Sequence, residues 1–130
     1  ACEQPDRTVG KAGAGGMKHA HYALGRLKVG QMNRTEAEYA ALLEQRRRAG
    51  EVAWWKFEGI KFRLGDNCHY SPDFVVMLAG GRMQIHEVKG HWQDDAKVKI
   101  KIAADLYPFE FIAVRKQPKK AGGGFGEEHF

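Results

Sequence analysis

The pattern of apolar and polar positions changes its period several times along the chain. Residues 33–49 contain apolar side chains at the spacing of one helical face. This stripe consists of Tyr39, Leu42 and Leu43. Asn33 or Thr35 is placed to cap the segment at its start, and Gly50 follows it as a stop signal. The pattern therefore predicts a helix over 33–49.

Extended segments follow this helix. Aromatic, alternating segments predict strands over residues 53–58 and 60–64. Two more strands are predicted over 70–78 and 82–89, on either side of the loop 79–81. Residues 94–106 alternate in part like a strand, but their length and alanine content favour a helix, which Pro108 ends. The apolar segment 109–114 predicts a last strand in a covered sheet. The order helix, strands, helix, strand predicts an α/β fold with a mixed central sheet flanked by helices.

Glycine and charge divide the chain into three parts. Eight of its 16 glycines lie in residues 1–16 and 117–130, which we expect to be flexible tails around one domain over 17–116. The formal net charge is +5, and all of this excess falls within 17–116. A basic domain favours a polyanionic partner, with nucleic acid first. A basic protein without such a partner is the alternative from charge alone.

Cysteine content and hydropathy bear on the compartment. The chain has two cysteines, Cys2 and Cys68, which form no disulfide framework and fit a reducing compartment. Its longest unbroken apolar run is six residues, 74–79, so we expect neither a membrane-spanning helix nor a membrane partner. No apolar stretch follows a basic start, so we expect no secretory signal and a cytoplasmic location.

The candidate chemistry lies on the two strands that meet at Gly80-Gly81. Asp73 is near the start of one strand, and Glu87 and Lys89 are near the end of the next. A two-residue loop would place Asp73 and Glu87 on opposite faces, whereas a three-residue loop over 79–81 places them directly opposite each other. Glycine supplies the left-handed residue that a three-residue loop needs, so we expect the second register.

In that register two carboxylates lie at the edge of an otherwise apolar face. They repel each other and lose hydration, and a bound cation removes both penalties. Ligands that are all oxygen suit Mg²⁺ or Mn²⁺, and Lys89 is placed to hold an attacking water or to stabilise charge on a phosphate. The alternative is a surface hairpin with unconnected charges.

These residues resemble a known motif. Pro72-Asp73 followed by Glu87-Val88-Lys89 resembles the motif of the PD-(D/E)XK nuclease superfamily. Residues 70–74 and 86–90, with Trp92, resemble the phage Holliday-junction resolvases of the endonuclease I type. Residues 33–39 and 95–102 are similar to small phage proteins of the same superfamily.

The resemblance implies a restriction-endonuclease-like core and a site with assigned roles. Asp73, Glu87 and the backbone carbonyl of Val88 would hold the metal ion, and Lys89 would orient or activate the attacking water. A glutamate of the first helix would support the ion directly or through water. We expect Glu36 in this role because it lies nearer the apolar stripe than Glu38 does. Asn33 and Glu36, like Thr35 and Glu38, also have the spacing of a capping box, which is a purely structural role.

Four further residues are candidates for contacts with DNA, namely Lys97, Lys101, His91 and Arg46. Lys97 and Lys101 share one helical face, although a solvated face explains them equally well. His91 follows the motif, and Arg46 belongs to a basic last turn that also suits the helix dipole.

With the resemblance, these features lead us to expect a Mg²⁺-dependent endonuclease. The resemblance to phage resolvases further implies a homodimer that acts on branched or Holliday-junction DNA, in phage recombination or processing within a bacterial host. The alternatives are a nuclease specific for a sequence or a DNA end, and a basic DNA-binding module without catalysis.

Overall fold

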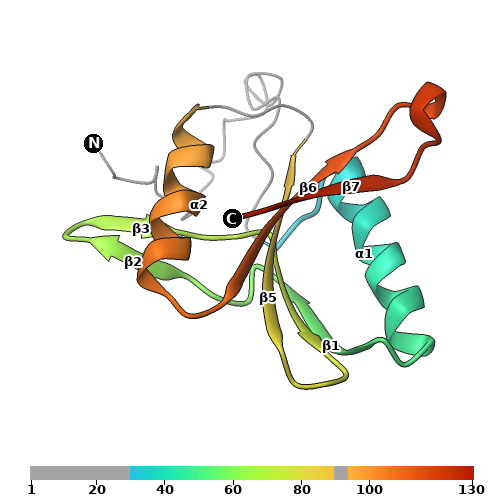
Figure 1. Cartoon of the computed structure of the whole chain (residues 1–130), viewed down its shortest axis with the longest axis horizontal. Coiled ribbons are helices and arrows are strands. Elements are labelled where there is room, and N and C mark those ends of the chain that lie inside the picture. The colour runs from blue at the N-terminus through green and yellow to red at the C-terminus, as the bar shows by residue number, and fades with distance from the viewer. Residues whose placement is uncertain (1–29, 90–93) are drawn as a thin grey trace, which may run out of the picture.

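A mixed five-stranded sheet, with one helix on each face, organises the protein (Figure 1). The computed structural model describes residues 30–89 and 94–130. In chain order the elements are α1 (Arg34–Arg48), β1 (Val52–Phe57), β2 (Phe62–Gly65), β3 (Cys68–Tyr70), β4 (Phe74–Leu78), β5 (Met83–Lys89), α2 (Asp94–Leu106), β6 (Glu110–Lys116), the 3₁₀ turn η2 (Lys119–Ala121) and β7 (Phe125–His129).

The strands of the sheet lie in the order β1-β4-β5-β6-β7. Strand β4 is antiparallel to β1 and to β5, β6 is parallel to β5, and β7 is antiparallel to β6. Strands β2 and β3 form a separate two-stranded hairpin. The α/β class with a mixed sheet and flanking helices, predicted from the sequence, is therefore confirmed.

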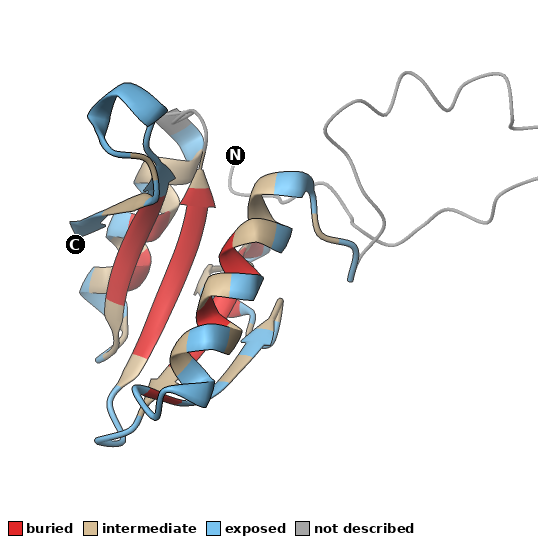
Figure 2. Cartoon of the chain, turned by 90° about the vertical axis from the view of Figure 1, so that its right-hand side faces the viewer, coloured by how far each residue is buried: buried red, intermediate tan, exposed pale blue. Residues whose placement is uncertain are grey.

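Helix α1 covers one face of the sheet. Asn33 caps it and accepts a hydrogen bond from the Glu36 backbone, while the Glu36 side chain accepts one from the Asn33 backbone. Its inward residues Tyr39 and Leu43 are buried against apolar side chains from all five strands of the sheet. Figure 2 shows that burial is concentrated in the central strands and on the side of α1 that faces them.

A buried histidine lies under α1. His86 Nδ1 is 2.6 Å from the Tyr39 hydroxyl, and its Nε2 is 3.0 Å from Gln84 Oε1. Burial lowers the pKa of His86 to about 4, so the ring is neutral at physiological pH. The neutral ring has one donor and one acceptor nitrogen, and both are used. Across the described ranges, no buried side-chain nitrogen or oxygen lacks a hydrogen-bond partner.

Helix α2 and the β2–β3 hairpin cover the opposite face. Ile100 and Ala103 of α2 are fully buried against Val75, Ile85 and Phe111 of the sheet. Phe62 and Tyr70 of the hairpin complete this second core. The sheet thus separates two apolar cores, and its central strands are buried on both sides.

The register of β4 against β5 is the one that the sequence predicts. Phe74 pairs with His86, Val75 with Ile85, and Met77 with Met83. The connection is closed by a hydrogen bond from the Leu78 amide to the Arg82 carbonyl, and Gly81 within it has a φ of 91°. The prediction of a three-residue loop over 79–81 is therefore confirmed.

The predicted single strand over 70–78 is wrong. Strand β3 ends at Tyr70 and pairs with β2, whereas β4 begins at Phe74 in the main sheet. Pro72 lies between them, and proline has no amide hydrogen to donate to a ladder. The chain therefore leaves one sheet and enters the other at this point.

The prediction of a flexible tail over 117–130 is also wrong. Strand β7 pairs with β6 from Ile112↔His129 to Lys116↔Phe125. Phe125 packs against the core beneath α1, with its ring centroid 5.1 Å from that of Tyr39. The domain therefore extends past residue 116. The predicted tail over 1–16 and the start of the domain up to 29 lie outside the described residues.

Candidate active site

Asp73 and Glu87 are both buried where β4 begins and β5 ends, on the face covered by α2 and the β2–β3 hairpin. Each carboxylate accepts a hydrogen bond from the backbone of the other strand. The Asp73 amide donates to Glu87 Oε2 at 3.2 Å, and the Val88 amide donates to Asp73 Oδ2 at 2.9 Å. The two side chains are thus held by main-chain atoms, which limits how far either can move.

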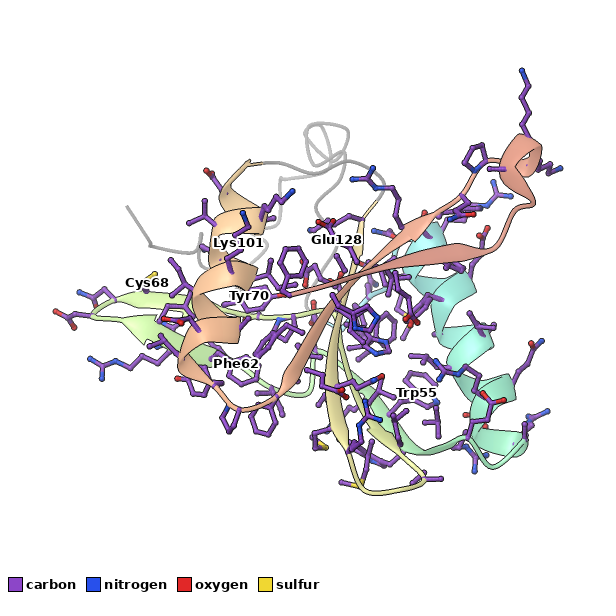
Figure 3. The ribbon with its side chains drawn as sticks, in the orientation of Figure 1. Trp55, Phe62, Cys68, Tyr70, Lys101 and Glu128 are labelled. Carbon is purple, nitrogen blue, oxygen red and sulfur yellow. The ribbon has the colours of Figure 1, made fainter. Side chains whose placement is uncertain are left out.

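Two further side chains bind Glu87. The Tyr70 hydroxyl donates to Glu87 Oε2 at 2.9 Å, and Lys89 Nζ lies 3.0 Å from Glu87 Oε1. Tyr70 is buried between the hairpin and the sheet (Figure 3). Asp73, Glu87 and Lys89 are therefore brought together as the sequence predicts, and Tyr70 joins them. No role for Tyr70 was predicted, because its position follows from the break at Pro72.

Burial and mutual charge dominate the electrostatics of these groups. Burial, followed by the negative charge of Glu87, raises the pKa of Asp73 well above its usual value. Burial alone would lower the pKa of Lys89, because it disfavours the charged ammonium group. The carboxylates of Glu87 and Asp73 have a larger combined effect and raise the pKa. Lys89 is consequently a cation at neutral pH. The site therefore holds more negative charge than its buried position favours, even with Lys89 beside it.

Glu36 lies close enough to sense this charge. Burial raises its pKa, the Asn33 hydrogen bond lowers it, and the charges of Glu58 and Glu87 raise it further. Its carboxylate also caps α1, so the structural role considered for it is present. Glu38 instead forms ion pairs with Lys116 and, at 3.6 Å, with Arg34. Of the two glutamates, only Glu36 is coupled to Glu87.

Glu58 and Arg115 are neighbours of the site that the sequence did not indicate. The Glu58 amide donates to the Asp73 carbonyl at 2.7 Å, and Glu58 has a φ of 49° immediately after β1. Arg115 of β6 pairs with Lys89 in the parallel ladder. Neither position could be derived from motif spacing, because the registers of β1 and β6 depend on tertiary pairing. An acidic residue directly before Gly59, at a predicted strand end, was the one available signal for Glu58.

The predicted DNA-binding residues are scattered. Lys97 lies 3.8 Å from Glu128, and Lys101 is exposed on α2 (Figure 3). Arg46 pairs with Glu51 at 3.2 Å. It is ten residues along α1 from Glu36, or ~15 Å along the helix axis. His91 lies outside the described residues. The structure thus separates Arg46 from the carboxylates.

The donor set suits a hard divalent cation. Asp73, Glu87 and the backbone beside them offer oxygen atoms only, which Mg²⁺ and Mn²⁺ prefer. Burial, followed by the negative charge of Glu87, raises the pKa of Asp73, and a bound cation would offset both effects. In the described part of the chain, no three side chains of the types His, Cys, Asp and Glu form a ready-made cluster for a metal ion. Backbone carbonyls and water would have to supply the remaining ligands.

Comparison with known proteins adds no assignment. No family model matches this chain, and neither a curated protein nor a solved structure shows significant similarity to it. Among the helices that the structure describes, none is long and apolar enough to span a membrane. Any proposal about function therefore depends on the geometry and on the motif.

Proposed function

We propose that this protein is a metal-dependent DNA endonuclease with a PD-(D/E)XK-type site. One observation carries the proposal: Asp73, Glu87 and Lys89 converge on one face of two adjacent central strands. The mixed sheet with a helix on each face agrees with the core that the motif implies. Buried acidic groups beside a lysine are unusual in a merely structural hairpin, because their desolvation is unfavourable.

In this proposal each residue has a distinct task. Asp73, Glu87 and the Val88 carbonyl would hold Mg²⁺ or Mn²⁺, and Glu36 would support the ion directly or through water. The ion, when bound, supplies charge stabilisation and a more acidic water. Lys89, a cation at neutral pH, donates a hydrogen bond to the attacking water or to a phosphate oxygen. Tyr70 and the Asp73 amide fix Glu87, so the carboxylate keeps its orientation.

The proposed substrate is branched DNA of the Holliday-junction type, processed in phage recombination inside a bacterial cell. This substrate follows from the resemblance of residues 70–74 and 86–90 to junction resolvases. Resolution of a junction needs two paired cuts, so the proposal includes a homodimer. A nuclease that recognises a sequence or a DNA end would use the same residues with a different arrangement of two sites.

A DNA-binding module without catalysis is the second candidate, and one observation favours it. Both oxygens of Glu87 already have partners within the protein, in Lys89, Tyr70 and the Asp73 amide. Such a closed set of contacts can be purely structural. The two candidates differ in a measurable way, because only the nuclease depends on a divalent ion.

The decisive test is a cleavage assay with Mg²⁺, using a four-way junction and a linear duplex of the same sequence. The full chain should cut with Mg²⁺ and not in EDTA, and it should prefer the junction. Asp73→Asn and Glu87→Gln should lower the rate by roughly 10²-fold or more, since metal-supported charge stabilisation is lost. DNA affinity should hold or rise, because negative charge near the phosphates is removed. Lys89→Ala should also abolish cutting.

Glu51→Gln is the matched control, because Glu51 is an exposed acid at the far end of α1. It should cut like the unmodified chain. Binding without Mg²⁺-dependent cutting would favour the DNA-binding module. Cutting that survives all three site substitutions would place the active site elsewhere.

A further inference from the structure

The hairpin that joins β6 to β7 carries a concentration of positive charge. Between residues 115 and 126 the chain has four basic side chains and no acidic one. These are Arg115, Lys116, Lys119 and Lys120, all exposed. We refer to residues 115–126 as the basic arm. In Figure 1 it projects beyond the end of the sheet, and η2 lies at its tip.

The basic arm has a defined conformation. The Gln117 amide donates to the Gly124 carbonyl at 2.9 Å, which continues the ladder past Lys116↔Phe125. At the tip the amides of residues 121 and 123 both donate to the Pro118 carbonyl. Three consecutive glycines, 122 to 124, have φ values between 67° and 95°, a region that other residues rarely adopt. The two lysines of η2 are therefore presented on an ordered turn, which lowers the entropy lost when they bind a partner.

The basic arm begins beside the candidate active site. Arg115 pairs with Lys89 on the neighbouring strand, so the two side chains point to the same face, the one that also carries Glu87. The residue opposite Arg115 on β7 is Gly126, which has no side chain to cover it. Lys116 points the other way and is paired with Glu38. Arg115, Lys119 and Lys120 form no ion pair with any of the residues described.

We propose that Arg115, Lys119 and Lys120 of the basic arm bind the phosphate backbone of the DNA segment next to the bond that is cut. This inference rests on the proposed function only for the position of the cut. Arg115 would contact a phosphate adjacent to the one beside Lys89. The lysines of η2 would contact the duplex further along, on one side of the cut.

The geometry sets how far this contact extends. Lys119 follows Arg115 by four residues, which in an extended chain covers at most ~13 Å. Base pairs rise about 3.4 Å each, so the basic arm reaches about four base pairs from the site. Phosphate contacts of this kind give affinity and orientation rather than sequence selectivity.

The test compares two double variants for DNA affinity in EDTA, where cutting cannot interfere. Lys119→Gln/Lys120→Gln removes the charge of the tip. Arg47→Gln/Arg48→Gln removes an equal charge from the last turn of α1, at the opposite end of the helix from Glu36. Affinity for a 30-base-pair duplex is measured across a range of salt concentrations. Urea unfolding of each variant shows whether the fold is retained.

The tip variant should bind on the order of tenfold more weakly at 0.1 M salt, and its log–log salt slope should be smaller by about 1.8. The control, Arg47→Gln/Arg48→Gln, should have a much smaller effect on both the DNA affinity and the salt slope. Arg115→Gln should reduce the slope by about 0.9, which tests the arm through a residue outside the turn. An equal loss in both double variants, no loss in either, or no DNA binding by the unmodified chain would each overturn the inference.

This experiment is independent of the test of catalysis. If the unmodified chain binds DNA through the tip lysines but never cuts with Mg²⁺, the basic arm stands and the nuclease proposal fails. If the chain cuts with Mg²⁺ but the tip variant binds and cuts like the control, the nuclease proposal stands and the inference about the basic arm fails.

Discussion

At the scale of single residues, Glu36 has one structural role that the structure shows and one site role that is proposed. Its carboxylate closes a capping box with Asn33, and the same carboxylate is coupled to Glu87. The sequence predicted both readings, and it could not choose between them because a cap and a site residue share the same spacing. The structure shows the cap, and the site role stays a prediction, supported by the electrostatic influence of Glu87 and Lys89 on Glu36.

Glu36→Gln should therefore separate the two roles. Glutamine can still accept the hydrogen bond from the Asn33 amide, so the midpoint of urea unfolding should stay nearly unchanged. The Mg²⁺-dependent cleavage rate should fall at least tenfold, because one negative charge near the proposed metal site is lost. Glu38→Gln is the control, and it should reduce cleavage less. A larger effect at Glu38 would mean that the wrong face of α1 was assigned to the site.

At the scale of elements, the β4–β5 hairpin decides whether the site can exist. A slip of one residue would move Asp73 to the α1 face and leave Glu87 behind. The sequence was sufficient here because glycine supplied the left-handed residue that a three-residue loop needs. The resulting register also placed Val75 and Met77 beside Ile85 and Met83 on one apolar face. The sequence was insufficient to predict the structure of residues 70–73. There the chain passes from one sheet to the other at Pro72, and this places the Tyr70 hydroxyl within hydrogen-bonding distance of Glu87.

Gly81→Ala should weaken this hairpin. Its φ of 91° is unfavourable for a residue with a side chain, so the free energy of unfolding should fall by about 1 kcal/mol or more. Gly80→Ala is the matched control, because Gly80 has no positive φ and its added methyl group would meet no atom within 4 Å. It should leave stability unchanged or raise it slightly. Equal effects of the two substitutions, measured by urea denaturation, would contradict the loop conformation described above.

At the scale of the whole molecule, β7 completes the domain. The sequence of 117–130 looks like a tail because its glycines dominate and its apolar residues are few. Tertiary contacts hold this segment in place. Phe125 enters the core beneath α1, and the Phe130 amide donates a hydrogen bond to the Phe111 carbonyl. Local pattern cannot report such contacts, since one aromatic residue among glycines has no period.

Phe125→Ala should show that β7 belongs to the folded unit. Loss of a partly buried aromatic side chain should lower the free energy of unfolding by about 2 kcal/mol. Leu106→Ala removes an apolar side chain that is 53% exposed at the end of α2, and it should change stability by less than about 0.5 kcal/mol. Both changes in the free energy of unfolding are to be measured by urea denaturation, followed by tryptophan fluorescence. Unfolding of Phe125→Ala at the same urea concentration as the unmodified chain would show that β7 is not docked.

The place of β4 and β5 inside the sheet has a consequence for fluctuations. Strand β4 is hydrogen-bonded to β1 and β5, and β5 is hydrogen-bonded to β4 and β6. Both strands also have an apolar core above and below. Their amide hydrogens can exchange with solvent only when much of the protein opens, whereas the edges at β1 and β7 can open locally. We therefore expect Asp73, Glu87 and Lys89 to stay assembled while the molecule is folded, because Glu87 and Lys89 lie on β5 and Asp73 directly precedes β4. Fraying at either edge leaves their arrangement intact.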